Sequence, residues 1–224
     1  MVLTDLSYSA LKAYQRQHRD HFPENLSLRV HRALSWLSKA EEARSNKDTD
    51  TEFIYYWISF NAAYANEFGE TDRIGEKELF QAFLTKIADL DTSEKLYQLI
   101  WQQFSGSIRL LMDNKFVYQP FWDYHRGRIS EEEWQQRFMA SKAALNVALS
   151  SKNVPVAMAQ IFTRLYTLRN QIIHGGATYN SQVNREQLKD ACNLLNKLIP
   201  LIIALMMSAP DQLWGEGCYP VLDV

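Results

Sequence analysis

Three polar side chains in the last third of the chain have the types and the spacing that acid–base chemistry on a phosphate ester needs. Arg169, Asn170 and His174 lie in the stretch RLYTLRNQIIHGG. A helix places Asn170 and His174 on one face, because they are four residues apart, and the long side chain of Arg169 can reach across to them. Histidine exchanges a proton near neutral pH, and arginine binds phosphate oxygens. The three side chains therefore predict a site for an anionic substrate.

Cleavage of RNA by its own 2′-hydroxyl is a reaction that this set fits. It needs a base at that hydroxyl, an acid at the leaving 5′-oxygen and a cation on the crowded phosphorane. His174 would transfer a proton and Arg169 would supply the cation. Because one histidine cannot easily be both base and acid in a single step, a two-fold dimer would complete the set without a metal ion.

The helix that must hold these side chains is expected over residues 154–174. Its opposite face is an apolar stripe that anchors the helix to a core, as a preorganised site requires. Gly175 and Gly176 end the helix directly after His174, so the imidazole lies at the negative end of the helix dipole, which favours its protonated form. The apolar stripe consists of Ile161, Leu165, Leu168 and Ile172.

The spacing of arginine and histidine alone is weak evidence for a site. A histidine four to six residues after an arginine should occur about once by chance in a chain of this composition. Arg16 and His21 have the same spacing, but they lie in a polar stretch that ends at Pro23. Because no apolar stripe anchors that stretch, context favours Arg169 and His174.

Two purely structural explanations compete with a functional site. Arg169 could form a surface ion pair with Asp190 or Glu186, and His174 could bond the last carbonyl groups of its own helix. The neighbouring Asn170 and the Gly-Gly stop make the functional interpretation the better one.

Helical spacing of apolar residues dominates the whole chain. No run alternates strictly like a half-buried strand, and no Asn-Gly or Asp-Gly hairpin signal occurs. With 224 residues, 46% of them apolar and 22% charged, the chain can bury a core and fits one globular domain. We predict a single all-α domain over residues 1–224. Helices are expected within 6–17, 26–44, 50–68, 78–90, 93–114, 116–149, 154–174 and 184–208, the last kinked at Pro200.

The helix within 50–68 is apolar on almost every side, which predicts a central position in the core. Asp50 or Thr51 is expected to cap its N-terminus. Asn61 lies among the aromatic side chains, and a polar amide there must find partners, most simply by bridging two helices. Base stacking would need exposed rings, so the aromatic residues are expected in the core. They are Phe53, Tyr56, Trp57, Phe60 and Tyr64.

The segment 116–149 is aromatic, then basic, then strongly acidic, and predicts a helical hairpin or lid. Ser130 and Glu133 form a capping-box pattern at the start of its second part. Arg126 and Arg128 could contact phosphate, although a short charge run is more often a solvated turn.

Several function classes lose their usual support. The formal net charge is −2, so any bound polyanion must be held by a local cluster. No P-loop, HExxH, paired CxxC or GxSxG pattern occurs, and no metal site or cofactor is predicted.

Two cysteines and no secretory signal fit a reducing cytoplasm. A helix needs roughly 20 apolar residues to span a bilayer, so the apolar run at 198–207 is too short and predicts a core helix instead.

With these residues in view, the chain resembles the HEPN superfamily of small all-α proteins. The signature of that superfamily is an arginine, commonly a polar residue next, and a histidine four to six residues after the arginine; here it reads Arg169, Asn170 and His174. The likeness is closest to Apea-like and related bacterial HEPN domains. FIYYWISFNAAYANEF resembles their aromatic early helix and RNQIIHGG their late one, so the resemblance covers about residues 27–68 and 155–207.

The resemblance implies a four-helix bundle core with an inserted helical region at about residues 70–150. It also implies a homodimer with the signature at its cleft and a metal-independent endoribonuclease of the toxin or antiviral-defence type. RNA would be the substrate, and an antitoxin or a nucleotidyltransferase would be a protein partner.

Roles for single residues also follow from the resemblance. Arg169 would steady the phosphate, Asn170 would orient or contact it, and His174 would transfer the proton. Asn61 and Tyr64 would support the cleft from the early helix.

Some members of such families bind nucleotides or proteins without cutting anything, so two alternatives stay open. The first is a non-catalytic module that binds a nucleotide or RNA through the same helix end. The second is a helical interaction protein that docks a partner through residues 126–133, with the RNQIIHGG stretch serving only as a helix terminus.

Overall fold

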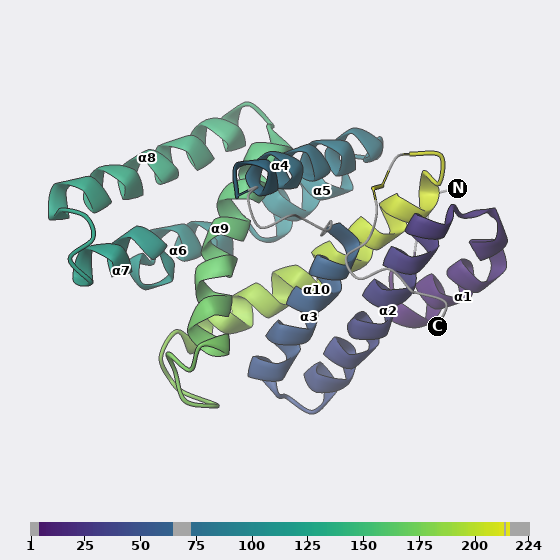
Figure 1. The fold of residues 1–224 in the computed structure, drawn as a ribbon, viewed down its shortest axis with the longest axis horizontal. Helices are drawn as coiled ribbons and strands as arrows, with labels where there is room; N and C mark the ends of the chain where they lie inside the picture. The colour runs from purple at the N-terminus through teal and green to yellow at the C-terminus, as the bar shows by residue number, and fades with distance from the viewer. Residues whose placement is uncertain (1–4, 65–72, 213, 216–224) are drawn as a thin grey trace. The chain divides into compact units, whose positions relative to one another are not determined.

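The computed structural model describes residues 5–64, 73–212 and 214–215, and their regular structure is entirely helical (Figure 1). No strand occurs in these ranges. The prediction of an all-α protein is therefore confirmed. The last residues of the helix expected within 50–68 lie outside the described residues. Cys218 also lies outside them.

The chain divides into two compact units, Met1–Thr92 with Cys192–Val224, and Ser93–Ala191. The predicted insertion at about 70–150 covers α4 of the first unit and α5–α8 of the second. The first unit contains α1 (Tyr8–His18), η1 (Arg19–His21), α2 (Glu24–Ser45), α3 (Thr49–Tyr64), α4 (Arg73–Leu90) and the C-terminal part of α10 (Arg185–Ser208). The second contains α5 (Lys95–Tyr97), the π-helical η2 (Gln98–Gln103), α6 (Ser105–Asp113), the 3-10 turn η3 (Lys115–Val117), α7 (Gln119–His125), α8 (Glu131–Ser150), α9 (Val154–Ile173) and the start of α10.

In the first unit, α2 and α3 form an antiparallel pair (Figure 1). Lys47, in the left-handed conformation with φ 59°, turns the chain between them. The Asp48 carboxylate accepts a hydrogen bond from the Thr51 backbone at 3.2 Å, so α3 begins at Thr49. The prediction that Asp50 or Thr51 caps this helix was therefore wrong by two or three residues, because the four neighbouring polar residues 48–51 offer similar capping oxygens.

The aromatic residues of α3 supply much of the core of the first unit, as their spacing predicts. Phe53, Tyr56, Trp57 and Phe60 are buried, whereas Tyr64 is half-buried. The helix α10 runs through Pro200 without ending there. It is the one helix among the described residues that is long and apolar enough to cross a membrane, but 67% of its most apolar stretch is buried inside the protein.

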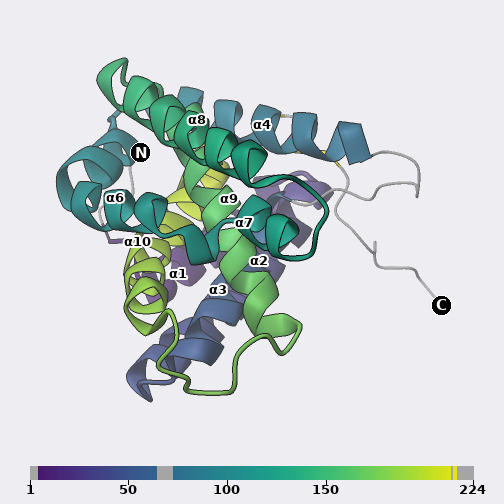
Figure 2. The same cartoon turned by 90° about the vertical axis from the view of Figure 1, so that its left-hand side faces the viewer.

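In the second unit, α8 and α9 pack against each other, and α6 and η3 also contact α9 (Figure 2). The expected helix over 93–114 is interrupted, since Glu94 takes a left-handed φ of 52° and Phe104 separates η2 from α6. Ser130 caps α8 by accepting a hydrogen bond from the Glu133 backbone at 3.2 Å, as predicted. The apolar face of α9 is buried at Ile161, Phe162, Leu165 and Leu168, and this packing fixes the helix that carries the candidate site.

Candidate active site

The C-terminal end of α9 is closed by a glycine turn directly after His174. The Gly175 backbone donates to the Ile172 carbonyl at 3.1 Å, and the Gly176 backbone donates to the Gln171 carbonyl at 2.7 Å. These two bonds form a Schellman motif, which needs a left-handed residue just past the helix. Gly175 meets that need with φ 67°. At Gly176 a Cβ atom would lie 3.0 Å from the Gln171 carbonyl oxygen, so glycine avoids a close contact.

Arg169 and Asn170 are joined side chain to side chain. Nη1 of Arg169 donates a hydrogen bond to Oδ1 of Asn170 at 2.9 Å. Because the amide oxygen of Asn170 accepts this bond, the NH₂ group of the same amide points away from Arg169 and can donate to another group. Both side chains are half-buried, so each is partly accessible from the protein surface. The pair therefore presents donors, which suit the oxygens of an anion.

Arg169 forms no ion pair within the described part of the chain, and its Nε atom is buried without a hydrogen-bond partner. Glu186 pairs with Lys189 at 2.8 Å instead. The structure therefore does not contain the alternative ion pair of Arg169 with Asp190 or Glu186. A guanidinium without a carboxylate keeps its positive charge available to a ligand.

His174 is the C-cap residue of α9, and its side chain is exposed. Its backbone N–H donates to the Asn170 carbonyl at 3.0 Å, which continues the helical pattern for one last step. Among the described residues no side chain or carbonyl hydrogen-bonds its imidazole. The structure thus brings Arg169 and Asn170 into contact and leaves His174 exposed, without a bond to either of their side chains.

Gln171, inside the motif, ties this helix end to two other segments of the second unit. Its Nε2 donates to the Phe116 carbonyl at 2.6 Å, and its Oε1 accepts from Nδ2 of Asn184 at 3.1 Å. Asn184 in turn accepts from Nδ2 of Asn114 at 3.4 Å. Sequence reasoning missed this positioning role, although Gln171 follows Leu168 at helical spacing and so lies on the core side of α9.

The residues predicted to support the site from the early helix lie in the first unit. Tyr64 stacks on Phe60 with ring centroids 4.9 Å apart and meets Phe80 edge-on at 5.2 Å, so it packs with core aromatics. Asn61 is half-buried. It makes no side-chain hydrogen bond among the described residues, so the expected bridge between two helices is not found there.

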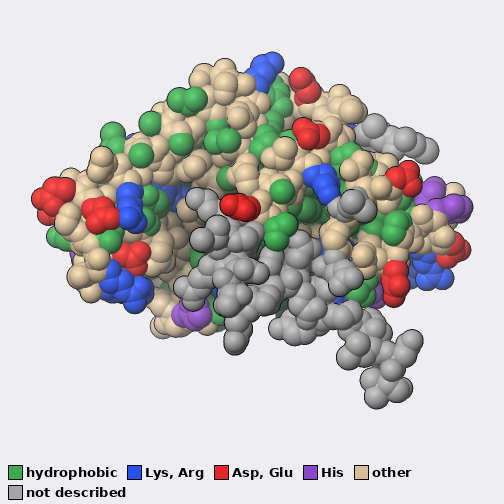
Figure 3. Space-filling model, turned by 45° about the horizontal axis from the view of Figure 1, so that its top comes forward, with side chains coloured by type: hydrophobic (Ala, Val, Ile, Leu, Met, Phe, Trp, Pro, Cys, Tyr) green, Lys and Arg blue, Asp and Glu red, His purple; other side chains and the backbone are tan. Residues whose placement is uncertain are grey.

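Arg126 and Arg128 lie in the turn between α7 and α8, and both are exposed. Nη1 of Arg128 is 3.5 Å from the Asp123 carboxylate, so part of its charge is balanced locally. Neither residue has an ion pair or hydrogen bond with the α9 motif. On the face drawn in Figure 3, Lys and Arg side chains are interspersed with Asp and Glu side chains rather than gathered in one broad area.

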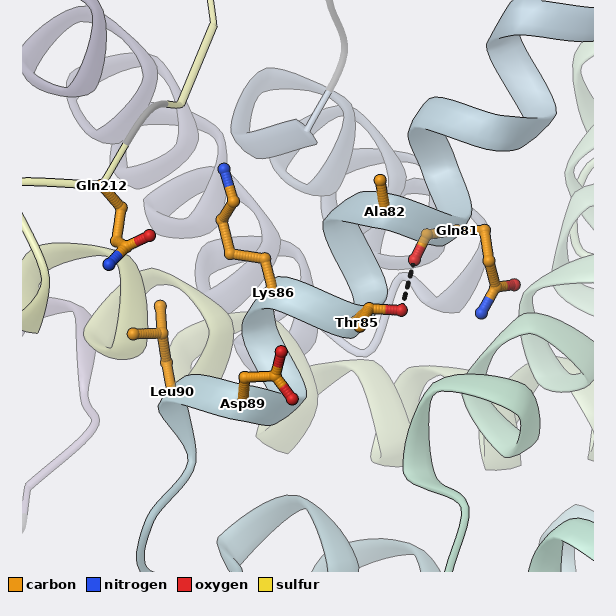
Figure 4. A pocket seen from close by; sticks show the side chains of 7 residues that line it. All are labelled: Gln81, Ala82, Thr85, Lys86, Asp89, Leu90 and Gln212. Carbon is orange, nitrogen blue, oxygen red and sulfur yellow. Dashed lines mark hydrogen bonds between the residues drawn. The ribbon is translucent and has the colours of Figure 1, made fainter.

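An open hollow of about 640 Å³ runs along α4 in the first unit (Figure 4). Lys86 and Asp89 both line it, together with Thr85 and Gln212. Burial, aided by the charge of Arg29, lowers the pKa of the Lys86 amine. The hollow carries both signs of charge and none of the predicted site residues.

A second arginine of α9 is fully buried and was not anticipated from the sequence. The Arg164 guanidinium carbon lies 3.9 Å from the centre of the Tyr118 ring and 5.1 Å from that of Phe138. Its hydrogen bonds to the Met112 carbonyl and the Ser141 hydroxyl are long, 3.4 Å each, and its Nε and Nη1 atoms have no partner. Burial lowers the pKa of Arg164 to about 10.

Comparisons with known proteins add no relative to this picture. A scan against protein-family models, a search of curated proteins and a search of solved structures each return no match for the chain. The described residues also contain no group of three or more His, Cys, Asp or Glu side chains placed to hold a metal ion. The structure therefore defines an all-α protein with a cluster of donors at one helix end, and function must be argued from that cluster.

Proposed function

We propose that this protein is a metal-independent endoribonuclease of the HEPN type, which cuts RNA by attack of its own 2′-hydroxyl and works as a homodimer. The observation that carries the proposal is the end of α9, where the joined Arg169–Asn170 pair is followed after four residues by the exposed His174. A rigid helix with a buried apolar face holds all three residues, and rigid elements give a site its precision.

The Arg169–Asn170 pair is the phosphate-binding part of the proposed site. Arg169 lacks a carboxylate partner among the described residues, so its positive charge is not balanced by a neighbouring side chain. Asn170 adds an amide N–H that points away from Arg169 because its oxygen is already engaged. Charge-assisted hydrogen bonds of this kind are shorter and about twice as strong as neutral ones. Both residues would therefore stabilise the extra negative charge of the phosphorane.

His174 is the proton-transfer group. As base it would remove the proton of the ribose 2′-hydroxyl, whose oxygen then forms a bond to the adjacent phosphorus. The bond from phosphorus to the 5′-oxygen breaks, and an acid returns a proton to that oxygen. The products are a 2′,3′-cyclic phosphate and a 5′-hydroxyl, with no external reactant. Base and acid act together in this step, so His174 of a second copy is the proposed acid.

The decisive experiment is cleavage of a mixed RNA pool in EDTA by the wild type and by His174→Ala, with the product ends analysed. We expect cutting by the wild type alone and cyclic phosphate ends. His21→Ala is the matched control, because Arg16 and His21 repeat the spacing of the motif but lie in α1 and η1. Its activity should equal that of the wild type. Equal cutting by His174→Ala, or loss of all cutting in EDTA, would refute the mechanism.

A second candidate function is a non-catalytic RNA-binding module that uses the same helix end. One observation favours it: among the described residues no group orients the His174 imidazole, whereas a catalytic base is usually oriented by a third group. RNA that binds the wild type in EDTA, depends on Arg169 and yields no product would establish this function instead. An antitoxin or nucleotidyltransferase remains the proposed protein partner in either case.

A further inference from the structure

An aromatic ring stands on the protein surface beside the proposed phosphate site. Tyr166 precedes Arg169 by three residues and Asn170 by four, so it shares their face of α9. Its side chain is 52% exposed, although most large apolar side chains of α9 are buried. The guanidinium carbon of Arg169 lies 6.0 Å from the centre of the ring, at the outer limit of a cation–π contact. An accessible ring and a phosphate-binding pair are thus neighbours on one rigid helix.

This combination is the one that proteins use for single-stranded nucleic acids. Positive side chains follow the backbone, and aromatic rings take the bases, because every base has a flat face that can stack. In a duplex both faces of each base are already covered by neighbouring bases, so a protein ring has no face to bind. RNA is read mostly in single-stranded segments whose bases can be splayed out onto aromatic side chains.

We infer that Tyr166 is the residue on which one unpaired base of the RNA stacks while Arg169 and Asn170 hold an adjacent phosphate. The inference rests on the proposed function, whose substrate it narrows. Tyr166 lies one helical turn, about 5 Å, before the donor pair along α9. A base and the phosphate of its own or the next nucleotide can therefore engage both groups without bending the helix.

Other exposed aromatic residues of the second unit fit this role less well. Phe116 is 45% exposed but lies in η3 and not on α9, so no helical register fixes its ring beside Arg169. Tyr179 is 72% exposed but lies beyond the glycine turn that ends α9, outside the helical register of Arg169. Tyr166 alone combines exposure with a fixed place beside the arginine.

The test uses the full chain and a short RNA that carries one 2-aminopurine and 2′-O-methyl groups, which prevent cleavage. Stacking on an aromatic ring quenches 2-aminopurine fluorescence, and a purely structural role of Tyr166 would not change that signal. We expect the wild type and Tyr166→Phe to bind and quench alike. Tyr166→Leu should bind about tenfold more weakly and lose the quench, since one stacked base is worth roughly 5- to 150-fold in affinity. The same RNA annealed to its complement should bind the wild type more weakly than the single strand.

A cleavable RNA gives the second measurement, which separates this inference from the proposed function. Tyr166→Leu should raise KM about tenfold and change kcat little, because stacking contributes to binding in the ground state and the transition state alike. Cleavage with unchanged KM and quench in Tyr166→Leu would overturn the stacking role and leave the nuclease standing. Binding and quenching by the wild type without any product would overturn the nuclease and leave the stacking role standing.

Three further results would overturn the inference. The first is a wild type that binds duplex and single-stranded RNA equally well. The second is a Tyr166→Leu variant whose only defect, measured by sedimentation, is loss of the dimer, since the ring would then be a contact between copies. The third is a wild type that binds no RNA, which would overturn the proposed function as well.

Discussion

Arg169 donates a hydrogen bond to the side chain of its own neighbour, Asn170, at 2.9 Å. Consecutive residues on a helix point about 100° apart, so the arginine must bend over the helix surface to make this bond. The bond fixes which way the Asn170 amide faces, and it leaves the positive charge of Arg169 without a carboxylate among the described residues. The two side chains therefore act as one donor group, and a substitution at either residue should weaken the binding of an anion by both.

Asn170→Asp should disable this donor group without unfolding the protein. The new carboxylate would pair with Arg169 and place a negative charge where the phosphate is proposed to bind. Because charge-assisted bonds are worth about 1.5 to 3 kcal/mol, we expect RNA affinity and cleavage to fall by about 10- to 100-fold. Asn146→Asp, at an exposed position of α8, is the matched control and should leave both unchanged. Equal binding by the two variants would remove Asn170 from the site.

Gln171→Leu should loosen the end of α9. The substitution removes the bonds to the Phe116 carbonyl and to Asn184, and two hydrogen bonds contribute about 1 to 3 kcal/mol to the free energy of unfolding. Urea unfolding would measure that loss, and hydrogen exchange should speed up at the amides of His174 and Gly175. Gln135→Leu, which removes an exposed i,i+4 bond to Glu131, should change stability by about 0.5 kcal/mol or less.

The parts of this fold that sequence reasoning found are those governed by local rules. The all-α class follows from helical spacing, and the stop after His174 follows from Gly175, since a left-handed residue is needed there. The N-terminus of α3 was misplaced because the choice among neighbouring polar residues depends on where the preceding turn ends. That turn is fixed by Lys47, whose positive φ no local rule would have chosen.

The parts that sequence reasoning missed depend on long-range packing. Arg164 lies three residues after Ile161 and four before Leu168, so the apolar stripe itself placed it on the core face of α9. The rule that arginine is almost never fully buried unless paired opposes that placement. The rings of Tyr118 and Phe138, which come from other segments, stabilise the buried guanidinium together with its two long hydrogen bonds. No single sequence identifies which distant rings will cover a given side chain.

Tyr56→Phe should weaken the contact between α3 and α10 in the first unit. The Tyr56 hydroxyl is buried and donates to Oδ1 of Asn196 at 2.7 Å, and burial raises its pKa. Removing the hydroxyl leaves the amide oxygen without its donor, which should lower the free energy of unfolding by about 1 kcal/mol. Tyr14→Phe is the control, because no hydrogen bond of its hydroxyl occurs among the described residues. A double mutant with Asn196→Ala should show coupling between the two side chains, and additive effects would contradict the bond.

Arg164→Met should stabilise the protein. Burying a charge without a carboxylate is costly, and replacing buried ionic groups by apolar residues of similar volume is often worth 1 to 4 kcal/mol. Methionine is flexible enough to fill the space between Tyr118 and Phe138. We expect urea unfolding to show a gain of about 1 to 4 kcal/mol. Arg137→Met, at an exposed position paired with Glu133, should give almost none. A loss of stability in Arg164→Met would mean that the cation–π contacts outweigh desolvation.

The pH dependence of that gain tests its cause. Burial lowers the pKa of Arg164 from its ordinary value to about 10, so from about pH 10 up to that ordinary value the unfolded chain binds more protons than the folded one. Stability of the wild type, measured relative to Arg164→Met, must therefore rise with pH in that window. Below it both states are protonated, and the buried charge costs its full amount. We expect the advantage of Arg164→Met to be constant from about pH 7 to 9 and to shrink from about pH 10 upward. The difference between the wild type and Arg137→Met should stay flat over the same range, because that arginine is exposed to solvent in the folded protein. An advantage of Arg164→Met that does not change up to about pH 11 would show that packing, rather than the buried charge, sets the stability of this helix.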